Sequence, residues 1–126
     1  MPDAEFDVMQ IVWSQPSPVS SMQVAALAAP EKQWKPQTVL TLLARLTKRG
    51  FLLSEKQGWE RVYTPLVSKE AYLNQETGDF VRKFHKDSLT GLMNALYADK
   101  SPGEEELAGL EKWLKERKEG ERRAKP

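Results

Sequence analysis

Apolar and polar side chains follow a helical period between Pro36 and Arg49. The apolar positions have the i, i+3, i+4, i+7 spacing of one helix face: Val39, Leu42, Leu43 and Leu46. The opposite face carries polar side chains: Gln37, Thr41, Arg45 and Lys48. Proline is favoured at the first position of a helix and glycine just past the last, which suits Pro36 and Gly50. The pattern therefore predicts a helix with one buried face and one face free for binding.

A hairpin is predicted directly after this helix. Phe51–Leu53 and Arg61–Thr64 concentrate apolar, aromatic and β-branched residues, and Gln57-Gly58 between them is a turn signal. Lys56 and Arg61 lie near the expected tip, where basic side chains have no core to join. A helix that could read bases, followed by a basic hairpin, is the layout of a recognition helix and its wing.

Two further helices are predicted before Pro36. The first runs from Ala4 to Trp13 with Asp3 as its N-cap, and its expected core residues are Phe6, Met9 and Trp13. Ser20 and Gln23 have the spacing of a capping box, so the second helix begins there and is expected to stop at Pro30. Its expected inward residues are Val24, Leu27 and Ala28.

Only helices are predicted beyond Pro65. Ser68 caps one that reaches Lys86, and a second helix contains Leu89–Tyr97. A third begins at a capping box over Ser101–Glu104, with Pro102 at its first position, and continues through Leu107 to Leu114. Their apolar residues are too many for three short helices to bury, so either the winged part or a second copy of the chain must cover them. We favour a second copy, because DNA-binding heads usually act as symmetric pairs. The expected dimerisation residues are Phe80, Phe84, Leu89, Leu92, Met93, Leu96, Leu110 and Trp113.

The expected fold is mainly α with a small β wing. Residues 1–67 form a winged helix-turn-helix DNA-binding domain, residues 68–118 form a helical dimerisation domain, and residues 119–126 form a flexible tail.

Composition narrows the functional classes. The chain lacks cysteine and has one histidine, His85, which argues against thiolate or imidazole metal sites, and we expect no metal and no cofactor. No apolar run approaches the roughly 20 residues of a membrane span, and the acidic N-terminus is unlike a targeting peptide. We therefore expect a cytoplasmic protein without membrane contact.

Charge is distributed unevenly along the chain. The net charge is only +1, yet residues 1–34 carry −3, residues 35–68 carry +4, and residues 69–126 are balanced. The positive charge thus lies on the predicted helix and hairpin, which indicates double-stranded DNA as the partner. The acidic residues are interleaved with basic ones at helical spacing, so the pattern does not indicate an enzyme. The alternative is a winged helix that serves as a protein–protein interaction module without binding DNA.

Four segments, in this order and at these distances, carry a resemblance to a known family. They are DAEFDVMQIVW, SPVSSMQVAALA, WKPQTVLTLLARLTKRGFL and RVYTPLVS. Together they resemble the penicillinase-repressor (BlaI/MecI/CopY-like) family of winged-helix transcriptional regulators over about residues 3 to 118. The third segment is the specific one; the C-terminal helices match mainly by length and apolar pattern. The resemblance implies a homodimeric repressor that binds a palindromic operator.

The resemblance also implies which residues meet DNA. The family's recognition and wing positions, together with the flanking basic residues, correspond in this chain to Lys35, Gln37, Thr38, Thr41, Arg45, Lys48, Lys56 and Arg61. Two positions depart from the family. Lys35 stands where a capping serine is usual, and it meets the positive end of the helix dipole, a conflict that a phosphate would relieve. Leu40 occupies a position that is often basic, so one contact is expected to be missing.

Two branches of the family suggest inducing signals. The copper-responsive branch carries a C-terminal cysteine cluster, and its absence here argues against copper sensing. In the antibiotic-sensing branch, a membrane sensor-protease system leads to cleavage within the dimerisation region. The corresponding bond here is Ala95–Leu96, where the penicillinase and methicillin repressors have Asn-Phe. A sensor protease is thus a possible partner that the resemblance alone suggests.

Overall fold

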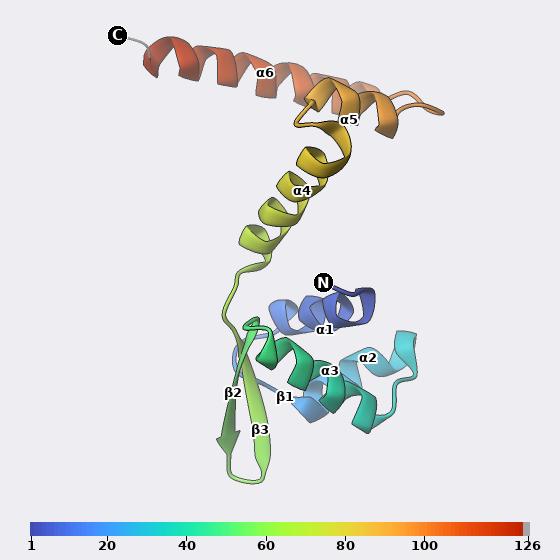
Figure 1. The fold of residues 1–126 in the computed structure, drawn as a ribbon, viewed down its shortest axis with the longest axis vertical. Coiled ribbons are helices and arrows are strands. Elements are labelled where there is room, and N and C mark those ends of the chain that lie inside the picture. Colours follow the sequence, from blue (N-terminus) through green and yellow to red (C-terminus); the bar gives the residue numbers. More distant parts are fainter. Residues whose placement is uncertain (125–126) are drawn as a thin grey trace. The chain divides into compact units, whose positions relative to one another are not determined.

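The computed structural model describes residues 1–124 and contains helices and a small antiparallel sheet (Figure 1). The elements in chain order are α1 (Asp3–Ser14), β1 (Val19–Ser20), α2 (Ser21–Lys32), α3 (Pro36–Lys48), β2 (Leu52–Gln57), β3 (Glu60–Pro65), α4 (Lys69–His85), α5 (Leu89–Leu96) and α6 (Glu104–Ala124). The chain divides into two compact units, Met1–Thr77 and Gly78 onward. The expected class, helical with a small β wing, is confirmed.

The first unit has a three-stranded sheet of order β1-β3-β2, one strand more than the sequence predicted. In the added strand, Val19 pairs with Tyr63 and Ser20 with Val62. A strand of two residues carries no alternation that could reveal it. In Figure 1 the closed end of the β2–β3 hairpin projects away from the three helices of this unit, as a wing does.

The apolar stripe of α3 forms the centre of the first unit, as predicted. Its four apolar residues are at most 5% exposed, and they join a core contributed by α1, α2 and the sheet. The prediction for α1 was partly wrong, since Val8 and Val12 are buried there beside Met9. Phe6 and Trp13 are only half-buried. Pro2, rather than Asp3, is the N-cap of α1.

Phe6 and Trp13 pack in an aromatic cluster around Tyr72. Their rings each lie 5.8 Å from the ring of Tyr72 in α4, as does that of Phe51, and the Trp13 indole N–H donates to the carbonyl of Val67 over 2.9 Å. Burial, together with a hydrogen bond to Glu76, raises the pKa of Tyr72 to about 12. Because this cluster ties the start of α4 to α1, the first unit extends to Thr77 rather than ending at 67.

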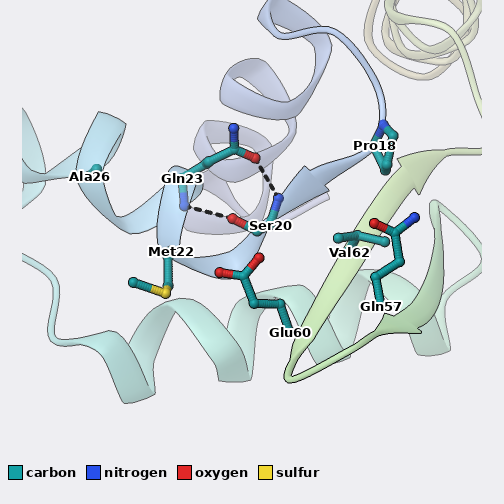
Figure 2. Close-up of a pocket in the computed structure, with 8 residues that line it drawn as sticks. All are labelled: Pro18, Ser20, Met22, Gln23, Ala26, Gln57, Glu60 and Val62. Carbon is teal, nitrogen blue, oxygen red and sulfur yellow. Dashed lines mark hydrogen bonds between the residues drawn. The ribbon is translucent and has the colours of Figure 1, made fainter.

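The structure confirms the predicted start of α2 but not its predicted end. Ser20 accepts a hydrogen bond from the Gln23 backbone N–H over 3.1 Å, and the Gln23 side chain accepts one from the Ser20 N–H over 2.8 Å (Figure 2). The predicted capping box is therefore confirmed. The helix continues past Pro30 to Lys32. Pro30 lies in the last turn, so its missing N–H and the crowding by its ring disturb only the exposed end of the helix. Leu27, expected to be inward, is 46% exposed.

The second unit is helical. Ser88 caps α5 by accepting a hydrogen bond from the Gly91 N–H over 3.0 Å, and a hydrogen bond to Glu106 raises the pKa of Tyr97. Three glutamates occupy the first turn of α6, where they interact favourably with the helix dipole. The helix continues to Ala124, so residues 119–124 are helical and do not form the predicted flexible tail. The remainder of the predicted tail, 125–126, lies outside the described residues.

A buried carboxylate joins α1 to the end of α3. Glu5 is 2% exposed, and its Oε1 lies 2.8 Å from the Arg49 Nη1 at the C-cap of α3. Oε1 has no hydrogen bond among the described residues, so the contact is an ion pair without good hydrogen-bond alignment. Since an unpaired buried charge is costly, Arg49 is a structural partner of Glu5.

We predict that Arg49→Ala lowers the free energy of unfolding by roughly 1–3 kcal/mol, because it leaves the Glu5 charge buried without a partner. Lys48→Ala is the matched control, since Lys48 is exposed and adjacent but forms no ion pair within the described chain. Adding Glu5→Gln to Arg49→Ala should restore part of the loss. Urea unfolding of the three variants measures this, and equal stability of the two single variants would contradict the role of the pair.

Candidate nucleic-acid interface

The outer face of α3 is exposed along its whole length. All five predicted recognition-helix residues are exposed: Gln37, Thr38, Thr41, Arg45 and Lys48. The Thr41 hydroxyl donates to the Gln37 carbonyl over 2.9 Å, so it cannot also donate to a base. Its methyl group and lone pairs remain available. Arg45 and Lys48 form no ion pair with any described residue, which leaves both charges for an external anion.

The N-terminus of α3 has a positive, uncapped character. Lys35 is the N-cap and makes no side-chain capping bond, and the first turn contains no acidic residue. The unpaired N–H groups of a helix start, together with the dipole, favour a negative group nearby. The predicted conflict at Lys35 is therefore present in the fold.

The wing has two chemically different faces. Lys56 pairs with Arg61 across the strands, and the next pair toward the tip is Gln57 with Glu60. Because successive residues of a strand point to opposite sides, the basic pair occupies one face and the amide–acid pair the other. The Arg61 guanidinium donates to the Ser54 hydroxyl over 2.9 Å, which holds it along the basic face. Only that face is suited to a phosphate backbone.

The tip of the wing differs slightly from the prediction. The strands continue to Gln57 and Glu60, so the turn consists of Gly58 and Trp59 rather than Gln57-Gly58. Gly58 has φ +62°, which glycine adopts without strain. Trp59 is fully exposed and has no packing partner in the described chain.

A shallow hollow lies between the start of α2 and the face of the wing that carries Gln57 and Glu60. Figure 2 shows its lining residues, which are Pro18, Ser20, Met22, Gln23, Ala26, Gln57, Glu60 and Val62. The hydrogen-bonding groups of Ser20 and Gln23 are already used in the capping box. With the Glu60 carboxylate on its border, this hollow does not favour an anionic backbone. It also contains Met22, an exposed residue that no pattern in the sequence identified as a candidate.

The predicted dimerisation residues all lie in the second unit, which includes the end of α4. Five of them are between 45% and 60% exposed: Phe80, Phe84, Leu89, Leu96 and Trp113. Leu92, Met93 and Leu110 are half-buried. The Phe80 and Phe84 rings lie 5.0 Å apart on one side of α4, and both remain open to solvent. Ala95 and Leu96, the predicted cleavage position, are exposed in the last turn of α5.

Neither a metal cluster nor a membrane span is found in the described chain. Within residues 1–124, no three His, Cys, Asp or Glu side chains are grouped as metal ligands. None of the helices described combines the length and apolar character that crossing a bilayer requires.

Comparison with known proteins agrees with this geometry. Residues 1–116 match the model of the penicillinase repressor family. The chain is 33% identical over 104 residues to the penicillinase repressor of Bacillus licheniformis, covering 82% of this chain and 80% of that protein. It is 29% identical over 90 residues to the methicillin resistance regulatory protein MecI of Staphylococcus aureus, covering 71% of this chain and 72% of that protein.

A solved structure supports the same assignment. The solution structure of the DNA-binding domain of the repressor BlaI has a TM-score of 0.52 and 35% sequence identity to this chain. The match covers 57% of this chain and 87% of that domain. With the family model spanning both units, these findings show that the chain belongs to the penicillinase repressor family.

Proposed function

We propose that this protein is a DNA-binding transcriptional repressor that reads an operator with α3 and grips the phosphate backbone with the basic face of its wing. The observation that carries the proposal is the outer face of α3, where Arg45 and Lys48 are exposed and unpaired beside polar side chains. The Lys56–Arg61 pair of the wing adds positive charge in the same unit. The relatives named as repressors, and the related DNA-binding domain, support this function. It requires neither catalysis nor a cofactor, and we place it in the cytoplasm.

The protein acts as a homodimer on a palindromic operator. An exposed patch of large apolar side chains normally marks an interface. The rings of Phe80 and Phe84 lie together and are exposed, and the second unit also exposes Leu89, Leu96 and Trp113. A two-fold pair of recognition helices would match a two-fold operator. The resemblance further suggests induction by a sensor protease that cuts at Ala95–Leu96, and the exposure of both residues is compatible with access by such an enzyme.

We predict tight binding to a palindromic duplex whose half-sites lie about one helical turn apart, with an affinity that falls steeply as salt rises. The reason is that basic side chains release counterions when they bind phosphates. Titrating selected and random duplexes at several salt concentrations measures both properties. Absence of any preference over random DNA would favour the protein-interaction alternative.

Recognition helix and wing should respond differently to mutation. Arg45→Ala should weaken binding to the operator by roughly 1–3 kcal/mol more than binding to random DNA, because a base contact is sequence-specific. Lys56→Ala should weaken both about equally, because phosphate contacts carry no sequence information. Fluorescence anisotropy with the two duplexes separates these effects. Equal losses on both duplexes for Arg45→Ala would reject its role as a base-reading residue.

The dimer should depend on the exposed aromatic pair of α4. Phe84→Glu places a charge on the proposed interface in both copies, and we expect it to produce monomers at micromolar concentration. Operator affinity should then fall by about 10²–10⁴, the gain of linking two binding heads. The control is Leu53→Glu, an exposed leucine of the first unit that should leave the protein dimeric. Sedimentation of both variants decides this, and a dimeric Phe84→Glu protein would place the interface elsewhere.

A further inference from the structure

Leu40 interrupts the polar face of α3 with an exposed apolar side chain. It is 40% exposed, although the buried stripe of the same helix holds every other large apolar residue of α3. Pro36, Leu40 and Ala44 follow one another at four-residue intervals, so they form a row on the helix surface. This row runs beside the polar row of Gln37, Thr41, Arg45 and Lys48. The outer face is thus half polar and half apolar.

Two hollows meet at Leu40. One lies along the outer face of α3 and is lined by Gln37, Leu40, Thr41, Ala44, Arg45 and Lys48. The other lies between the beginnings of α2 and α3 and is lined by Ser21, Met22, Ala25, Pro36 and Leu40. Met22, at 68% exposed, extends the apolar surface from α2 toward Leu40. The two helices of the helix-turn-helix therefore share a small apolar depression next to the polar recognition row.

The chemistry of base edges selects the occupant of this depression. In the major groove, adenine, guanine and cytosine present hydrogen-bonding groups, whereas thymine also presents its C5-methyl group. Ser21 is the one lining residue of this hollow with a polar side chain; against Leu40, Met22 and Pro36 a polar base edge would lose its water without a compensating hydrogen bond. A methyl group loses nothing and covers exposed apolar surface. Arg45 and Lys48, which line the neighbouring hollow on the outer face of α3, attract the DNA duplex that carries the methyl group.

We propose that the Leu40–Met22 depression is a thymine-methyl site that sets the operator preference of this protein. The chain would make an apolar contact with one thymine in each half-site through Leu40 and Met22. The inference rests on the proposed function, because it requires α3 to enter the major groove. It differs from a general phosphate contact in that it depends on a single methyl group.

Replacement of thymine by deoxyuridine tests the proposal, since it removes only the methyl group. Operator duplexes are first selected from a random library with the full-length protein, and each thymine of the selected duplex is then replaced in turn. At one symmetric pair of positions, we expect affinity to fall about fourfold for each methyl removed, the factor for one buried carbon group. Substitution at the other thymines should have a smaller effect.

Protein variants connect that effect to Leu40. Leu40→Ala keeps a good helix former at an exposed position, and it should bind thymine and deoxyuridine duplexes equally well. Leu27→Ala is the matched control, because Leu27 is 46% exposed on α2 and borders a different hollow, and it should retain the fourfold difference. Circular dichroism checks that both variants are folded.

Each outcome has a defined meaning. If selection yields no specific duplex, the proposed function fails and the methyl site fails with it. If an operator is found but deoxyuridine is tolerated everywhere, only the methyl site is overturned; this measurement needs the unmodified protein alone. A discrimination that persists in Leu40→Ala would assign the methyl contact to another residue, such as Thr38 or Thr41, and would equally overturn the proposal.

Discussion

The burial of one face of α3 is the constraint on which the first unit depends. Val39, Leu42, Leu43 and Leu46 anchor the helix among α1, α2 and the sheet, so its rotation about its own axis is fixed by core packing. The orientation of the outer face follows from that rotation. A change in the core stripe would therefore alter which side chains point outward, even without touching any exposed residue.

Electrostatics then divides the basic residues of the same segment into two groups. Arg49 is committed to the buried carboxylate of Glu5, whereas Arg45, Lys48 and Lys56 have no ion pair in the described chain. The segment charge of +4 thus overstates what an external partner can use. Counting charges along a sequence cannot reveal such a commitment, because Glu5 and Arg49 lie on different elements.

Much of the first unit could be predicted from sequence, because strong local signals agreed with the packing. The period of α3, the capping box at Ser20 and the glycine after α3 each determine local backbone structure directly. The two-residue strand β1 and the aromatic cluster around Tyr72 could not be predicted in this way, since they depend on contacts between distant segments. The ends of helices were harder to predict from sequence. Helix α2 continues beyond Pro30, and α6 continues through the charged residues after 118. The candidate recognition positions lie on an exposed face of α3, as expected. That Leu40 and Met22 line the same hollow could not be predicted from sequence, because they lie on different helices.

The two-residue turn of the wing determines which side chains share a face of the hairpin. With Gly58 and Trp59 in the turn, Lys56 and Arg61 fall opposite each other and share a face. Since side chains alternate along a strand, a shift of the pairing by one residue would send these two side chains to opposite faces. The number of residues in the turn therefore determines whether the two basic side chains share a face. An insertion of one residue at the tip would separate them, and a second insertion would bring them together again, while the composition of both strands stays unchanged.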